Sequence, residues 1–240
     1  MKKFIVSLAV LFLFVISISK QSYVINNWNR KIIEKSLGAT VVVIIDVANK
    51  EYLGAGVIIK PDGTILTAAH VVNHKNANMF AATYKGNEYN LRVLYINKYR
   101  DLALVQPFAS AQKFEWLKIQ KSNDLWIGED ILVIGHPFGN LYTVTTGTIL
   151  RLPFYLKYFC QIMEINALIG HGSSGGPVLN KKGEIIGIVS AMQINFIGQS
   201  LGVGIAIPVE VIHRFLSSYN NYLIKEQQIK RHQLGELYER

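Results

Sequence analysis

The chain has 240 residues, of which half are hydrophobic and 17% are charged, and its formal net charge is +9 at pH 7. This composition can build a sizeable core, so it excludes a disordered or low-complexity chain. A basic balance is compatible with anionic membranes or nucleic acids, but no nucleic-acid-binding motif accompanies the charge, and we expect no nucleic-acid partner.

The N-terminus combines positive charge with an apolar run. Lys2 and Lys3 precede 16 uncharged, mostly apolar residues from Phe4 to Ser19. A positive start followed by a short apolar run is typical of a secretory signal, and the run is short for a membrane span of about 20 residues. Residues 1–19 are therefore predicted to be a signal peptide or an uncleaved N-terminal membrane anchor. In both cases we expect the body of the protein to be exported to a periplasmic, cell-surface or extracellular location.

Residues 20–36 are polar with interspersed apolar side chains, and we predict a linker that leads into an amphipathic segment. From residue 37 to residue 207, short β-rich runs alternate with turn residues such as Pro61-Asp62-Gly63. The predicted strands are 40–47, 54–59, 64–68, 79–84, 88–96 and 102–106, then 130–135, 142–150, 159–165, 177–179, 185–191 and 202–207. This grouping predicts an all-β domain of two closed antiparallel barrels, at about 37–110 and 120–207, because closure removes exposed sheet edges.

The pattern changes after Pro208, a residue that is well tolerated in the first turn of a helix. Val209, Ile212, Phe215 and Leu216 then recur at three- and four-residue spacing, which predicts a C-terminal amphipathic helix. The domain is expected to end near residue 216, followed by an exposed helical tail over 217–240.

The strongest local motif is the glycine-rich loop from Gly172 to Pro177, which contains Ser173 and Ser174. Acyl transfer by a serine needs an exposed hydroxyl and converging backbone N–H groups that stabilise the oxyanion, and small residues let the backbone approach the substrate. Gly175 and Gly176 directly follow Ser174, so Ser174 is the candidate nucleophile. A glycine-rich turn without activity is the alternative explanation of this motif alone.

Two further motifs carry a histidine and an acid. His70 ends a predicted strand, between Ala69 and Val71, and Asp101 opens the apolar run at 102–105. Each alone is explained as structural, but a buried carboxylate needs a partner and an imidazolium is a suitable one. The chain order His, Asp, Ser matches the order of the chymotrypsin triad, with the first two residues in one predicted barrel and the serine in the other.

These motifs identify a resemblance to the HtrA/Deg (DegP-like) family of trypsin-like serine proteases, over about residues 38–216. Further matching stretches are 54–59, 134–139, 145–149, 183–188 and 202–208. The resemblance implies a chymotrypsin-like double β-barrel, degradation of unfolded or damaged polypeptides, and a homotrimer. Family members usually carry PDZ domains after the protease domain, whereas about 24 residues follow Leu216 here, so we expect a protease domain alone.

The same resemblance implies roles for single residues. Gly172, Ser173 and Ser174 form the expected oxyanion-hole loop, with the N–H groups of Gly172 and Ser174 as donors. Leu168, six residues before the nucleophile, is expected at the base of the primary specificity pocket, where an apolar side chain favours small or medium aliphatic substrates. Ser190, Ala191 and Met192 are expected to lie along the bound substrate. Barrel core is the alternative for these three residues and for Leu168.

Three alternatives stay open: a catalytically silent chaperone or adaptor that binds unfolded chains, a membrane-associated structural protein, and a cysteine protease. The last is disfavoured, because the single cysteine, Cys160, lies in a predicted strand 14 residues before Ser174. His74 and His136 lie in predicted turns with no assigned chemistry, and His171 is not expected to be the base. Since no metal-ligand spacing occurs, we expect no metal and no cofactor.

Overall fold

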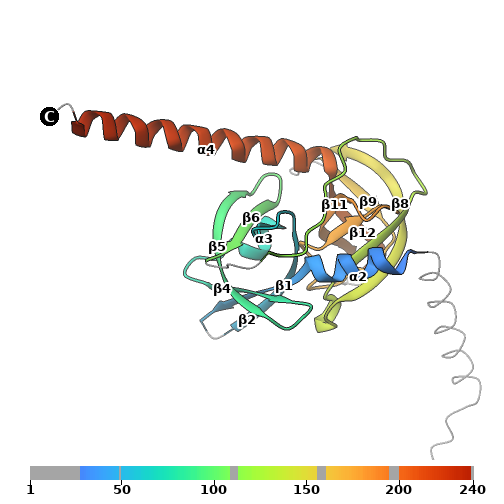
Figure 1. The fold of residues 1–240 in the computed structure, drawn as a ribbon. Coiled ribbons are helices and arrows are strands. Elements are labelled where there is room, and N and C mark those ends of the chain that lie inside the picture. The colour runs from blue at the N-terminus through green and yellow to red at the C-terminus, as the bar shows by residue number, and fades with distance from the viewer. Residues whose placement is uncertain (1–27, 49, 109–112, 156–160, 195–199, 239–240) are drawn as a thin grey trace, which may run out of the picture.

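The computed structural model describes residues 28–48, 50–108, 113–155, 161–194 and 200–238. It contains two closed six-stranded barrels with a long C-terminal helix, as Figure 1 shows, and so confirms the predicted fold class. Within the described residues, no helix is both long and apolar enough to cross a membrane. The predicted signal or anchor segment 1–19 and Cys160 lie outside the described residues.

The first barrel closes in the order β1-β2-β3-β6-β5-β4, and all of its neighbouring strands are antiparallel. Its strands are β1 (Thr40–Val47), β2 (Lys50–Ile58), β3 (Ile65–Thr67), β4 (Asn78–Thr83), β5 (Glu88–Asn97) and β6 (Leu102–Pro107).

The second barrel closes in the order β10-β11-β12-β9-β8-β7, again with antiparallel neighbours. Its strands are β7 (Asp130–Gly135), β8 (Thr143–Tyr155), β9 (Gln161–Ile165), β10 (Pro177–Leu179), β11 (Ile185–Ile194) and β12 (Ser200–Pro208).

Strand β6 explains how the two barrels share a core. Ala103 and Val105 face the interior of the first barrel, whereas Leu102 and Leu104 belong to a second apolar cluster that includes Leu132 of β7. Because successive side chains of a strand point to opposite faces, a strand that is buried on both faces reads as a continuous apolar run. The two barrels are thereby packed together at the face where β6 meets the second barrel.

Helix α2 (Arg30–Ala39) starts within the segment 20–36, which we predicted to be a linker that leads into an amphipathic segment. The Asn29 side chain caps this helix by accepting a hydrogen bond from the Lys31 N–H at 2.9 Å. Ile33 and Leu37 pack against the cluster shared by the barrels. Tertiary packing therefore stabilises a segment whose glycine and lack of acidic residues in the first turn make it a weak helix former.

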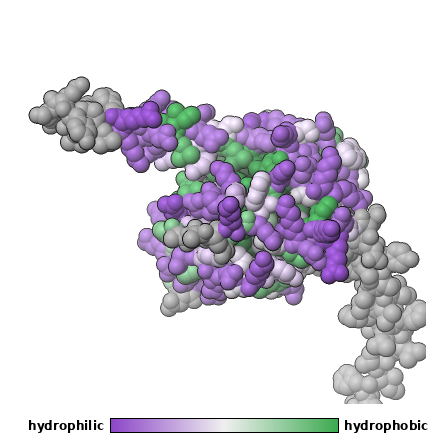
Figure 2. All heavy atoms as spheres, viewed as in Figure 1, coloured by the Kyte–Doolittle hydropathy of each residue, from purple (hydrophilic) through white to green (hydrophobic). Residues whose placement is uncertain are grey.

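Helix α4 (Val209–Tyr238) starts directly after β12 and continues through the predicted tail. Ile212 and Phe215 are fully buried, and Tyr95 of β5 contacts the rings of Phe215 and Tyr219. Its first half thus packs on the barrels, and the rest projects from the body (Figure 1). The coloured part of this projection is mainly hydrophilic on the face seen in Figure 2.

Candidate active site

His70 lies in the one-turn helix α3 (Ala69–Val72), just after β3. Its Nδ1 atom is 3.0 Å from Oδ1 and 2.9 Å from Oδ2 of Asp101. A carboxylate can only accept hydrogen bonds, so Nδ1 carries a proton, and in the neutral ring the lone pair is on Nε2. The side chain is half exposed, which leaves Nε2 available as a base.

Asp101 lies in the turn before β6, where its backbone has a φ of 50° in the left-handed region. Its carboxylate accepts from the His70 backbone N–H at 3.0 Å, from His70 Nδ1, and from the Ser190 hydroxyl of β11 at 2.5 Å. These donors satisfy a carboxylate that is 16% exposed. Because Ser190 belongs to the second barrel, the acid is fixed from both sides of the inter-barrel cleft.

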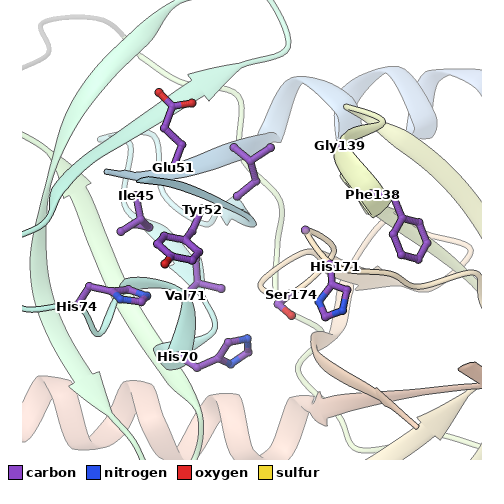
Figure 3. A pocket seen from close by; sticks show the side chains of 12 residues that line it. Ile45, Glu51, Tyr52, His70, Val71, His74, Phe138, Gly139, His171 and Ser174 are labelled. Carbon is purple, nitrogen blue, oxygen red and sulfur yellow. The ribbon is translucent and has the colours of Figure 1, made fainter. Parts of the chain in front are cut away.

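Ser174 lies on the loop between β9 and β10, and it lines the same cavity as His70 (Figure 3). Its carbonyl accepts a 2.7 Å hydrogen bond from the Ala55 N–H of β2, which ties the loop to the first barrel. The Ser174 hydroxyl donates a hydrogen bond to the backbone carbonyl of Ser190 at 3.0 Å. Within the part of the chain that the structure describes, it forms no hydrogen bond with His70. Such loose nucleophile–base geometry is common before substrate binds.

The expected oxyanion loop has a defined backbone orientation. Gly172 has a φ of 95°, and the His171 carbonyl before it accepts a 2.7 Å hydrogen bond from the Phe138 N–H. The C=O and N–H of a trans peptide point in opposite directions, so the Gly172 N–H points away from Phe138. In the described part of the chain, the backbone N–H groups of Gly172 and Ser174 have no protein acceptor.

Ser173 differs from its two neighbours, because its N–H donates to the Gly170 carbonyl at 2.9 Å. Its hydroxyl accepts from the Gly170 N–H at 3.2 Å, and the residue is 1% exposed. The Ser173 N–H is therefore occupied within the loop. Ser173 shapes the loop rather than supplying a donor to the cleft.

Two cavities adjoin Ser174. One has a volume of about 510 Å³ and is lined by His70, Tyr52, His74 and Gly172, among others (Figure 3). The other has a volume of about 370 Å³ and lies against the end of β11, where Ser190, Ala191 and Met192 line it. The three β11 residues named from the sequence are thus together beside Ser174.

Leu168 is not in this group. Its side chain is 60% exposed and does not line the 370 Å³ cavity, whereas the neighbouring Ile169 is 6% exposed and does. A Cβ atom on Gly204 of β12 would collide with the Ile169 side chain, so Ile169 points toward the interior of the second barrel. Of these two neighbouring residues, Ile169 rather than Leu168 lines the cavity, together with Ala191 and Met192.

Sequence reasoning missed the surroundings of two histidines. His74 stacks on Tyr52 with ring centroids 5.7 Å apart, beside the 510 Å³ cavity. His136 follows β7 and is fully buried, and burial lowers its pKa from the ordinary value. No local pattern around either histidine signals these contacts. Within the described ranges, no cluster of three or more metal-ligating side chains occurs.

Comparison with known proteins places this geometry in a family. Residues 54–188 match the trypsin-like peptidase domain. The chain is 32% identical over 185 residues to a probable periplasmic serine endoprotease DegP-like of Chlamydia pneumoniae, covering 76% of this chain and 36% of the relative. It is 33% identical over 174 residues to serine protease HTRA1 of Xenopus tropicalis, covering 70% of this chain and 36% of the relative.

The chain therefore spans about a third of the length of these curated relatives. A solved structure of the HtrA-type protease AlgW with tripeptide superposes with a TM-score of 0.70 and 26% identity, covering 78% of this chain and 62% of that one. The protein belongs to the trypsin-like peptidase family, with its relatives in the HtrA/DegP branch.

Proposed function

We propose that the protein is a serine endopeptidase in which Ser174 is the nucleophile, His70 the general base and Asp101 the orienting acid. The observation that carries this proposal is the His70–Asp101 pair, which directs Nδ1 of His70 to the carboxylate beside the cavity that His70, Ser174 and Gly172 line.

The reaction begins when Ser174 Oγ attacks the scissile carbonyl carbon and its proton passes to His70 Nε2. The negative oxygen of the tetrahedral intermediate accepts hydrogen bonds from the N–H groups of Gly172 and Ser174. The C–N bond then breaks as the imidazolium protonates the leaving amine, and water hydrolyses the acyl-enzyme by the same proton transfers in reverse order. Asp101 stabilises the imidazolium in both halves of the reaction.

The substrate is an extended or unfolded polypeptide. Residues before the scissile bond lie along Ser190, Ala191 and Met192, and the side chain next to that bond enters the 370 Å³ cavity beside Ile169. Residues after the bond enter the 510 Å³ cavity. We extend the proposal to degradation of unfolded or damaged exported proteins, because the Chlamydia relative is described as periplasmic and DegP-like.

One observation favours a second candidate, a catalytically silent chaperone that binds unfolded chains. The Ser174 hydroxyl is bonded to the Ser190 carbonyl and not to His70, as in a resting enzyme or an inactive relative. The two candidates differ in their dependence on the hydroxyl of Ser174.

Degradation of reduced casein by the wild type and by Ser174→Ala tests the proposal. Cleavage that is lost in the variant supports the endopeptidase, and cut sites after small or medium aliphatic residues support the assigned cavity. Equal casein binding without cleavage in both proteins would favour the chaperone. A serine-directed fluorophosphonate then separates a competent but resting Ser174, which becomes labelled, from an inactive one.

A further inference from the structure

The loop that follows β7 joins the two barrels next to the oxyanion loop. His136 begins this loop, and Tyr142 ends it just before β8. Each side chain forms a hydrogen bond to a backbone carbonyl of the first barrel. We name the pair His136–Tyr142 the inter-barrel clasp.

The His136 ring uses both of its nitrogens. Nδ1 accepts a 2.9 Å hydrogen bond from the Tyr142 N–H, so Nε2 carries the proton and donates to the Val41 carbonyl of β1 at 3.1 Å. The ring is fully buried and meets the Tyr142 ring edge-on at 4.9 Å. The ring therefore has one neutral tautomer that satisfies both partners.

Tyr142 makes the second connection. Its hydroxyl donates to the Ala82 carbonyl of β4 at 2.7 Å, and burial raises its pKa to about 12. Ala82 pairs with Val42 on β1, next to the carbonyl that His136 contacts. The clasp therefore attaches the loop at two points to the β1–β4 pair of the first barrel.

The same loop contacts the oxyanion peptide. Between the two clasp residues, the Phe138 N–H donates to the His171 carbonyl, and this bond sets the direction of the Gly172 N–H. Phe138 has a φ of 54° and a ψ of 33°, a left-handed conformation that non-glycine residues adopt only when their surroundings impose it. A Cβ atom on Gly172 would also collide with the His136 carbonyl, so the loop and the oxyanion peptide are in direct contact.

We propose that His136, supported by Tyr142, is a positioning residue that fixes the Gly172 N–H toward the substrate carbonyl through the Phe138–His171 hydrogen bond. The inference rests on the proposed endopeptidase activity. Its consequence is specific: loosening the clasp allows the 171–172 peptide to turn, which weakens stabilisation of the transition state and leaves ground-state binding of the peptide unchanged.

Three variants test the inference. His136→Asn keeps an acceptor for the Tyr142 N–H but is too short to reach the Val41 carbonyl. Tyr142→Phe removes only the hydroxyl bonded to Ala82. His213→Asn is the matched control, because His213 Nε2 also lies against a backbone carbonyl, that of Gln120 at 2.7 Å, but on α4 and outside the cavities beside Ser174.

The readouts are kcat and KM for a quenched-fluorescent peptide that contains a cut site mapped in casein, together with inhibition by a peptide boronic acid of the same sequence. Loss of a whole oxyanion donor lowers kcat by about 10²–10³-fold, so a misplaced donor in His136→Asn should lower it by about 10–100-fold. Boronate affinity should fall in parallel, because its adduct occupies the oxyanion site. KM should change by less than about twofold, and peptide binding to Ser174→Ala should equal binding to Ser174→Ala/His136→Asn. Tyr142→Phe should show a smaller fall in kcat, and His213→Asn none.

A wild-type kcat in His136→Asn, or a rise in KM with unchanged kcat, would overturn the inference. If His136→Asn does not fold, as judged by its thermal unfolding, Tyr142→Phe decides alone, and an unchanged kcat in that variant overturns the inference. The proposed function fails in a different way, because the wild type itself then shows no cleavage that depends on Ser174.

Discussion

Replacement of Asp101 by Asn tests whether the carboxylate orients the base. The Asp101 carboxylate accepts three hydrogen bonds, from the His70 backbone N–H, from His70 Nδ1 and from the Ser190 hydroxyl. An amide of the same shape has one oxygen and one NH2 group, so it cannot accept on both sides. If the NH2 group faces Nδ1, the ring proton moves to Nε2 and the base is lost.

The expected fall in kcat follows from this change of tautomer. The equivalent change in a Ser-His-Asp protease costs about 10⁴-fold in kcat, or about 5.4 kcal/mol at about 1.36 kcal/mol per factor of ten. Ser190→Ala removes one of the three hydrogen bonds and keeps the tautomer, so its loss should be far smaller. Both variants should keep the wild-type fold, because the changes are nearly isosteric.

The assay is steady-state cleavage of the casein-derived fluorescent peptide across pH, with thermal unfolding as a control for folding. An Asp101→Asn enzyme that is folded and within about tenfold of the wild-type kcat would refute the role given to Asp101, since no orienting acid could then be required.

Three further predictions concern the loop, the cavity and the buried imidazole. Gly172→Ala should lower both kcat and the unfolding temperature, because φ is 95° and the new Cβ meets the His136 carbonyl; wild-type values of both would contradict the backbone geometry. Ile169→Ala should shift the cut sites mapped by mass spectrometry toward larger side chains, whereas Leu168→Ala should leave them unchanged; the reverse result would restore Leu168 as the base of the pocket. Burial lowers the pKa of His136, so the unfolded state binds its proton first, and the free energy of unfolding should decrease as pH falls below about 6.5 toward the folded-state pKa. Urea titrations at several pH values should show that the free energy of unfolding depends less on pH in His136→Asn than in the wild type. An equal pH dependence in both proteins would contradict the burial of a neutral ring.

The sequence carried enough information to predict the double barrel. Runs such as 102–105 are apolar throughout because both faces of β6 are buried, and turn residues separate the strands at short intervals. The candidate residues His70, Asp101 and Ser174 could also be picked out from the sequence, since each occurs in a short motif and their chain order is that of a known arrangement. Strand ends were less accurate, because pairing extends β8 to residue 155 and β11 to residue 194 beyond the predicted limits.

What could not be predicted depends on contacts distant in sequence. His136 and the carbonyl of Val41 are 95 residues apart, and the Ser190 hydroxyl and Asp101 are 89 residues apart. The direction of the Leu168 side chain follows from the path of the loop, which places Ile169 rather than Leu168 in the cavity. Helix α2 forms because the partly buried Ile33 and Leu37 pack against residues that follow much later in the chain.

The central claim is that Ser174 becomes a nucleophile through His70. Mass spectrometry of the protein after treatment with a fluorophosphonate tests it most directly, with Ser174→Ala and His70→Ala treated in parallel. The account predicts a single phosphonyl adduct on Ser174 in the wild type, none at this position in Ser174→Ala, and strongly slowed labelling in His70→Ala. An unlabelled wild-type Ser174, or labelling that is equally fast without His70, would contradict it.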